Sequence, residues 1–283
     1  MSIKGTTLKT SLKPLLVVGG VGNGTGTGAA TAKLFARRGY DVSLIARGSD
    51  ALHRLSEEIN KEGRGKATPF PTASYRPNDI HAAFTSLSKF YGLPSSPLPS
   101  SSSSSLIKNQ THILRVALFN IAYPIFKPFL ETSDEDVQKS LEGNVQSAFT
   151  FSREVLLRLL ENEDVDINST LSRVNDSDDV STNKILGGKG TLIFTGATAS
   201  QRGNTMTSAF AAAKAGNRML SQSLAKEFGK EGVHVVHGIK TSTDAGFVRL
   251  QPESIAQVYW NVAHQDRSAW TWELDLRPAD EQW

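Results

Sequence analysis

The sequence predicts an α/β protein in which a doubly wound parallel sheet of about seven strands carries helices on both faces. Short apolar runs bounded by turn residues alternate with amphipathic stretches along the chain. A glycine-rich turn joins the first apolar run to the first amphipathic stretch, and no internal repeat is visible. Because 283 residues with 39% hydrophobic content can fill one large core, we expect a single domain over residues 1–283.

The expected elements follow one another in strand–helix order. Each expected strand is a short apolar run, at 15–19, 41–46, 66–72, 113–121, 191–196, 233–239 and 272–276. Each expected helix has apolar residues three or four positions apart, at 28–38, 49–62, 78–91, 208–229 and 252–264, with one long helix ending at 160. Ser133 and Asp136 predict a capping box that opens this long helix. Right-handed crossovers between successive strands then make the sheet parallel.

Two low-complexity insertions interrupt the alternation, at 93–112 and 161–189. The first contains a Pro/Ser run from Leu93 to Ser105, and the second is polar and acidic. Each follows a helix and precedes a strand, so we expect both at the amino edge of the sheet, opposite the edge where ligands bind. One interpretation is a tolerated insertion, and the other is a regulatory or phosphorylated loop.

Composition excludes several classes of protein. The net charge of +3 comes from 31 basic and 28 acidic residues without a basic stripe, so we expect no nucleic-acid partner. The chain has no cysteine and six scattered histidines, so we expect no metal. No apolar run approaches the roughly 20 residues of a membrane helix, and the N-terminus lacks an apolar signal segment. We therefore expect a cytoplasmic protein without a membrane partner.

The glycine-rich turn after the first strand predicts a dinucleotide site. Glycines let a backbone approach a pyrophosphate, and the start of the following helix favours its negative charge. Two registers of the glycines are open, Gly22-x-x-x-Gly26-x-Gly28 and Gly24-x-Gly26-x-x-Ala29. The expected contacts from this turn are Gly22, Asn23, Gly24, Thr25, Gly26 and Gly28.

The end of the second strand favours NADP(H) over NAD(H). NAD-specific folds place a carboxylate here to bind the ribose, whereas this chain has Ala46 and Arg47. Arg47 offers a planar, permanently charged group for a 2′-phosphate. The alternative interpretation of Arg47 is a solvated charge at the end of a strand.

Landmarks further along the chain resemble those of the short-chain dehydrogenases/reductases, over nearly its whole length. Asn120 and Ala122 match two positions of the family's Asn-Asn-Ala-Gly signature, and Asn144 matches its mid-helix asparagine. The glycine register that begins at Gly22 matches the family's motif best. The resemblance implies a Rossmann-like fold, a nicotinamide cofactor, and homodimers or homotetramers built through long helices. It also implies cofactor contacts from Asn120, Ala122, Thr195, Lys214 and Thr241.

The catalytic positions depart from the family pattern, which suggests an atypical branch. The family's Tyr-x-x-x-Lys motif becomes Phe210-x-x-x-Lys214, and Phe210 cannot donate a proton. The position of the family serine falls on Ala197 or Thr198, of which only Thr198 has a hydroxyl. Lys240 and Thr241 replace the family's Pro-Gly. Lys214 can still hydrogen-bond the nicotinamide ribose, as the family lysine does, and Asn144 can support a proton relay.

Two functions remain open. The first is an NADPH-dependent reductase of a small organic substrate with non-standard proton donation. In one route the substrate is cationic or conjugated, such as an iminium, and its reduction needs no strong acid at the reacting atom. In the other route Tyr123 donates the proton. The alternative interpretation of Tyr123 is an aromatic wall of the pocket. The second function is a redox-inactive NADP(H)-binding protein that acts as a sensor or scaffold.

Overall fold

The computed structural model describes the chain except for residues 1–11, 63, 95–109, 165–187, 242–249 and 280–283. Seven strands form one sheet in the order β3-β2-β1-β4-β5-β6-β7, and every neighbouring pair is parallel. The strands are β1 (Lys13–Gly19), β2 (Asp41–Ala46), β3 (Ala67–Pro71), β4 (His112–Phe119), β5 (Gly190–Thr195), β6 (Val233–Lys240) and β7 (Glu273–Leu276). The prediction of a doubly wound parallel sheet is confirmed.

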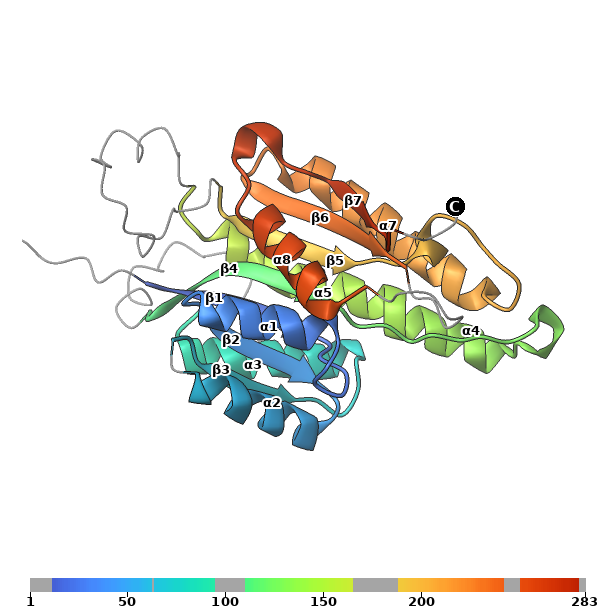
Figure 1. Ribbon diagram of the computed structural model, residues 1–283, viewed down its shortest axis with the longest axis horizontal. Helices are drawn as coiled ribbons and strands as arrows, with labels where there is room; N and C mark the ends of the chain where they lie inside the picture. Colours follow the sequence, from blue (N-terminus) through green and yellow to red (C-terminus); the bar gives the residue numbers. More distant parts are fainter. Residues whose placement is uncertain (1–11, 63, 95–109, 165–187, 242–249, 280–283) are drawn as a thin grey trace, which may run out of the picture.

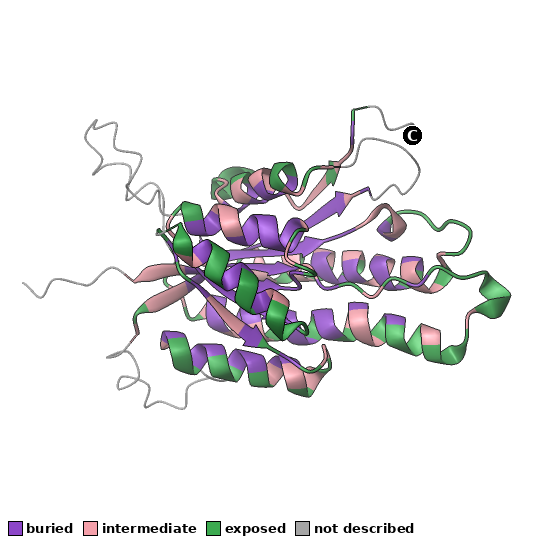
Figure 2. Ribbon diagram, turned by 60° about the horizontal axis from the view of Figure 1, so that its bottom comes forward, coloured by how far each residue is buried: buried purple, intermediate pink, exposed green. Residues whose placement is uncertain are grey.

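Helices cover both faces of the sheet (Figure 1). One face packs against α1 (Thr27–Arg37), α2 (Ser49–Lys61) and α8 (Pro252–Ala263). The other packs against α3 (Pro77–Tyr91), α5 (Ser147–Leu160) and α7 (Ser208–Phe228). Figure 2 shows the strands buried between these layers, whose outer faces are exposed. The strand order reverses between β1 and β4, so the topological switch point lies at their carboxyl ends.

The long helix expected to end at residue 160 has a different geometry in its middle. It begins at α4 (Asp134–Ser140) with the expected capping box, in which Ser133 and Asp136 bond reciprocally. A π-helical turn, η3 (Leu141–Gln146), then leads into α5. The Asn144 side chain donates to the Ser140 carbonyl at 2.9 Å, which competes with the regular helical hydrogen bonds. Periodicity alone does not reveal such a turn.

The described ends of both insertions lie at the amino edge of the sheet, because they adjoin the starts of β4 and β5. The first insertion is shorter than its expected 93–112 range, since Leu93 is 6% exposed in the core and His112 begins β4. At the second, Asn162 Nδ2 donates to the carbonyls of Leu114 and Lys189 at 2.7 and 2.8 Å. The residues between these ends fall outside the described part of the chain.

Membrane-spanning helices and metal-ligand clusters are both absent from the described residues. No helix in this part of the chain is both long and apolar enough to cross a membrane. Within the same residues, no three His, Cys, Asp or Glu side chains gather into a potential metal site.

Candidate active site

The glycine turn between β1 and α1 lies at the switch point. The amide of Gly20 donates to Ile45 in β2, and its carbonyl accepts from Asn120 Nδ2 at 2.7 Å. An added Cβ on Gly20, which has φ +92, would meet the Asn120 backbone, and one on Gly28 would meet the Gly20 carbonyl. These two glycines let β1, α1 and the end of β4 approach closely. Gly20 belongs to neither expected register, so it is a position that the sequence motifs miss.

The remainder of the turn surrounds open space. A Cβ at Gly22, Gly24 or Gly26 would meet no heavy atom within 4 Å. Asn23 Oδ1 accepts from the amide and hydroxyl of Thr25 at 3.2 and 2.7 Å, which fixes the exposed tip of the turn. Gly26 is the N-cap of α1 and provides no side-chain cap to the helix amides. The geometry fits a pyrophosphate, which would accept from the first amides of α1.

Arg47 follows β2 at the same edge and is exposed. Its guanidinium carbon lies 5.0 Å from the centroid of the Tyr75 ring, a cation–π contact. Tyr75 comes after β3 and is partly buried against the core. This contact restrains Arg47 and leaves its charge accessible to an anion. Because the contact joins residues 28 positions apart, the sequence pattern does not identify Tyr75 as the support.

Asn144 fixes the chain that follows β4. Its side chain is fully buried, donates to the Tyr123 carbonyl at 2.9 Å and accepts from the Tyr123 amide at 3.1 Å. The Tyr123 side chain packs against Gly143, where an added Cβ would meet Tyr123 Cβ at 2.6 Å. Asn120 and Ala122 lie between β4 and this clamp. Four expected site residues therefore come together here: Asn120, Ala122, Tyr123 and Asn144.

Thr195 and Thr198 lie where β5 ends. Thr195 closes β5, and its hydroxyl accepts from the Tyr259 hydroxyl at 3.2 Å. Thr198 begins a short 3-10 turn, and its hydroxyl accepts from the Arg277 guanidinium at 2.7 Å. Arg277 is not among the expected site residues, because it reaches Thr198 from the segment after β7. Ala197, the alternative match to the family serine, precedes the turn as its N-cap.

Phe210 and Lys214 lie one turn apart on α7. The Lys214 ammonium nitrogen is 5.8 Å from the centroid of the Phe210 ring and donates to the Thr195 carbonyl at 3.2 Å. Phe210 also makes an edge contact with Phe126, with ring centroids 5.7 Å apart. Lys214 is only 2% exposed. Burial first, and then the charge of Lys240, lower the pKa of Lys214 to about 8.

A second cluster of charged groups lies beside Lys214 on the sheet. His237 in β6 is fully buried and pairs through Nδ1 with Glu273 Oε2 at 3.1 Å, while Glu273 also binds Arg218 of α7 at 2.6 and 2.8 Å. Burial lowers the pKa of His237 to about 4, so the ring is neutral. Its Nε2 has no hydrogen-bond partner among the described residues. Lys240 and Thr241 follow at the end of β6, and burial lowers the pKa of Lys240.

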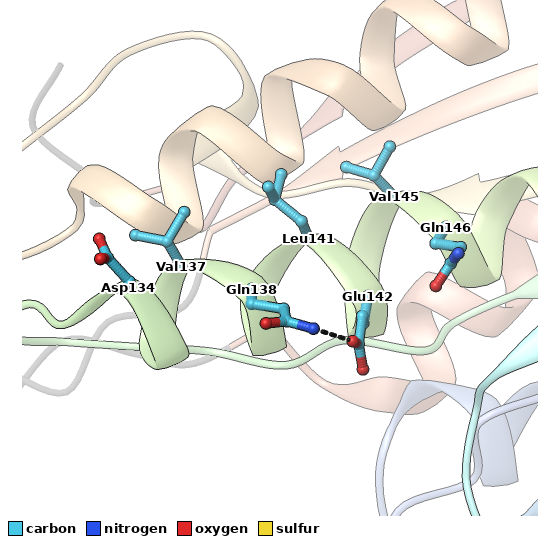
Figure 3. Close-up of a pocket in the computed structure, with 7 residues that line it drawn as sticks. All are labelled: Asp134, Val137, Gln138, Leu141, Glu142, Val145 and Gln146. Atoms are coloured by element: carbon cyan, nitrogen blue, oxygen red, sulfur yellow. Dashed lines mark hydrogen bonds between the residues drawn. The ribbon is translucent and has the colours of Figure 1, made fainter.

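The structure also contains a pocket of about 620 Å³ away from these residues. Figure 3 shows that its lining comes from one face of α4 and η3, namely Asp134, Val137, Gln138, Leu141, Glu142, Val145 and Gln146. None of the expected site residues lines it. It therefore belongs to the outer surface of the long helix and not to the carboxyl edge of the sheet.

Comparison with known proteins shows a similarity to the short-chain dehydrogenases. A family model described as short chain dehydrogenase matches residues 164–245. The structure is similar to a short-chain dehydrogenase from Rhodopseudomonas palustris, with 28% identity, a TM-score of 0.68, and coverage of 94% of this chain and 98% of that one. No curated protein matches the chain.

Two less identical structures share the fold. One is an alcohol dehydrogenase from the archaeon Thermococcus sibiricus complexed with 5-hydroxy-NADP, with 17% identity, a TM-score of 0.70, and coverage of 96% and 99%. The other is a short-chain dehydrogenase from Sphingobium yanoikuyae in complex with NADPH, with 17% identity, a TM-score of 0.65, and coverage of 93% and 87%. The family-model match over residues 164–245, the Rhodopseudomonas likeness and the sheet topology agree that the chain is similar to the short-chain dehydrogenases and shares their fold.

Proposed function

We propose that this protein is an NADP(H)-dependent oxidoreductase that reduces a small organic substrate at the carboxyl edge of its sheet. One observation carries the proposal: the glycine turn leaves open space at the uncapped start of α1, and Arg47 stands at the end of the neighbouring strand β2. The amides at this helix start suit a pyrophosphate, and the guanidinium suits a 2′-phosphate. Two structures that share the fold contain NADP-type cofactors, which supports the choice.

The remaining expected contacts divide along the edge of the sheet. Asn120 and Ala122 lie near the switch point, where they would contact the middle of the cofactor. Thr195, Lys214 and Thr241 lie toward β5 and β6, where they would hold its nicotinamide end. A reduced nicotinamide supplies hydride to a substrate carbon. Lys214 would orient this end through its ammonium group, and Asn144 would keep the Tyr123 segment in place beside it.

A redox-inactive binding role is the second candidate, and the catalytic positions favour it. Phe210 has no acidic group, and the Thr198 hydroxyl already accepts a hydrogen bond from Arg277. If no group of the chain protonates the substrate, the same cofactor site would serve a sensor or scaffold. Neither function calls for a resident metal.

Fluorescence titration with NADPH, followed by a screen of carbonyl and imine substrates, tests the proposal. We expect saturable binding and consumption of NADPH with at least one substrate class. Binding without consumption across the whole screen would favour the redox-inactive role. Absence of binding would contradict both functions.

Self-association and location complete the proposal. Large apolar side chains on the outer surface of the long helix and α7 are exposed, namely Val137 (39%), Leu141 (45%), Phe149 (51%) and Met219 (47%). We propose that these helices pair two or four copies of the chain, which would cover this surface. The proposed location is the cytoplasm. The proposed domain is the whole chain, with its two insertions at the amino edge away from the cofactor.

A further inference from the structure

Lys214 occupies an unusual environment for an ammonium group. Its side chain is 2% exposed, it donates to the Thr195 carbonyl at 3.2 Å, and the Phe210 ring lies one turn away. A phenylalanine at this position leaves the end of the lysine next to an aromatic surface, where no phenol can take or give a proton. Lys214 therefore places an acidic N–H group 5.8 Å from the centroid of the ring that stands where a tyrosine would.

The charged groups around Lys214 leave its charge uncompensated. Within the described residues, no carboxylate lies at ion-pair distance from Lys214 or Lys240. Glu273 in β7 is the acid of this cluster, and Arg218 and His237 already engage it. The other groups that face this region are the neutral His237 on β6 and the Tyr259 phenol on α8, which donates to Thr195. The second cation, Lys240, ends β6, and this strand pairs with β5 through Gly238 and Thr195, whose carbonyl accepts from Lys214. Lys240 therefore lies on the strand next to the Lys214 contact, and its charge adds to burial in lowering the pKa of Lys214.

This arrangement discriminates between substrate classes. Two desolvated cations repel a cationic substrate such as an iminium, and they stabilise an oxygen that gains negative charge. We propose that the substrate is a carbonyl compound, saturated or conjugated, whose oxygen receives its proton from the Lys214 ammonium, with Lys240 as the neighbouring cation that favours release of this proton. The inference rests on the proposed NADP(H)-dependent reduction.

The step balances in atoms and electrons. Hydride from the reduced nicotinamide forms a C–H bond at the carbonyl carbon, or at the β-carbon of a conjugated carbonyl, as the π electrons move to oxygen. Lys214 transfers one N–H proton to that oxygen, directly or through one water, and becomes a neutral amine. Water then returns a proton to the amine. A lysine whose pKa is lowered to about 8 is mostly protonated at neutral pH and gives up its proton more readily than an ordinary lysine.

Tyr123 is less well placed for this role. Its backbone is held by Asn144, and its side chain packs against Gly143 in η3. The pKa of Lys139 on α4 is raised first by Glu135, and Tyr123 is among the further groups that raise it. The Tyr123 side chain therefore packs toward the long helix formed by α4 and η3. Lys214, in contrast, is packed against Thr195 and Phe210 at the carboxyl edge of the sheet.

Nuclear magnetic resonance tests the coupling of the two lysines without turnover. The protein is labelled with ¹³C-lysine, the Lys214 Cε signal is assigned by its loss in Lys214→Met, and the signal is titrated through neutral and alkaline pH. We expect a midpoint of about 8 in the wild type and a midpoint shifted toward the ordinary lysine value of about 10.4 in Lys240→Met. Lys226→Met, which removes an exposed lysine from α7, should leave the midpoint unchanged. An unchanged midpoint in Lys240→Met would overturn the coupling.

Turnover with NADPH tests the substrate class and the acid. The rate of carbonyl reduction should fall as pH rises through the Lys214 midpoint, because the acid must be protonated. Lys214→Arg keeps the positive charge but cannot release a proton, so carbonyl reduction should fall by about a hundredfold or more while NADPH still binds. Carbonyl reduction at the wild-type rate in this variant, or reduction of iminium compounds alone, would overturn the inference. Failure of the wild type to bind NADPH would instead contradict the proposed function. NADPH binding therefore distinguishes a failure of the proposed function from a failure of the Lys214 inference.

Discussion

Lys214 Nζ lies 5.8 Å from the centroid of the Phe210 ring, one turn along α7. The lysine donates to the Thr195 carbonyl. This relationship differs from the Tyr-x-x-x-Lys motif of the short-chain dehydrogenases that the chain resembles, while the carboxyl edge has the glycine turn and Arg47 of the proposed cofactor site. Cofactor binding and proton transfer can therefore be tested separately, by variants at the two ends of the site.

Arg47→Ala should narrow the preference for NADPH over NADH. The guanidinium would bind the 2′-phosphate through charge-assisted hydrogen bonds, each of which contributes about 1.5 to 3 kcal/mol. We therefore expect the wild type to bind NADPH about tenfold or more tightly than NADH. Fluorescence titration of both cofactors measures the ratio. Arg54→Ala, which removes an exposed arginine from α2, is the matched control. Equal dissociation constants in the wild type would contradict the assigned role.

Phe210→Tyr should increase activity on simple ketones. The new phenol would lie beside Lys214, whose charge lowers the pKa of a neighbouring phenol, and Asn144 remains in place to support the site. The hydroxyl also has a cost of about 1 to 3 kcal/mol if it finds no partner against Phe126, so the native reaction should slow. NADPH consumption with a ketone panel compares wild type, Phe210→Tyr, and Phe210→Tyr with Ala197→Ser. If both variants bind NADPH and yet reduce no ketone, the site geometry differs from that of the family.

Asn144→Ala should destabilise the fold locally around Tyr123. The substitution removes the buried bonds to the Tyr123 amide and carbonyl and leaves both groups without their partner. The expected loss is about 1 to 3 kcal/mol in the free energy of unfolding, measured by urea denaturation. Gln146→Ala, at a neighbouring exposed position in η3, should change the stability little. A loss no greater in Asn144→Ala than in Gln146→Ala would contradict the clamp.

Stability should decrease as pH falls from about 6.5 to about 4. Burial, the largest cause in each case, lowers the pKa values of His234, His237 and His264 from 6.5 to about 4. In this window the unfolded chain binds more protons than the folded chain, so acid favours unfolding. Asp41, whose pKa is lowered from 3.8 to about 2, stabilises the fold above about pH 3.8 and loses this contribution as pH falls further toward 2. The urea concentration at the unfolding midpoint should fall less across this pH window in His237→Gln than in the wild type, because one buried histidine is removed. His53→Gln, which removes an exposed histidine, is the control and should show the same fall as the wild type. A flat profile in the wild type would show that these rings are not buried as neutral groups.

The sequence predicts the fold well because its signals are local. Apolar runs, helical spacing and the Ser133–Asp136 box each involve residues close in the chain, and the structure contains the corresponding elements. Leu93 is an exception, since a leucine beside a Pro/Ser run gives no local sign that it packs into the core. The π-helical turn at Asn144 also depends on a contact with a distant segment, the Tyr123 backbone.

The candidate site is predicted less completely, because its electrostatics depend on long-range contacts. Family motifs indicate Lys214, Phe210 and Thr198, but they do not reveal that Arg277 reaches Thr198 across 79 positions. In the sequence Lys240 is noticed only because it replaces the proline of the family's Pro-Gly. Its effect on the pKa of Lys214 depends on the packing of α7 against β6, which the sequence does not show. Gly20 is hidden among several neighbouring glycines that allow more than one register, and only the contact with Asn120 distinguishes it.

Transfer of deuterium from NADPH tests the proposed reduction most directly. The full-length protein is incubated with NADPH that carries deuterium at the reactive C4 position, together with aldehydes, ketones and conjugated enones, and the products are analysed by mass spectrometry. Lys214→Arg serves as the matched variant, since it keeps the charge but not the acid. We expect one deuterium on the former carbonyl carbon or β-carbon with the wild type and little with the variant. Unlabelled substrate recovered throughout, from wild-type protein with NADPH bound, would contradict the reduction and identify a cofactor-binding protein without redox turnover.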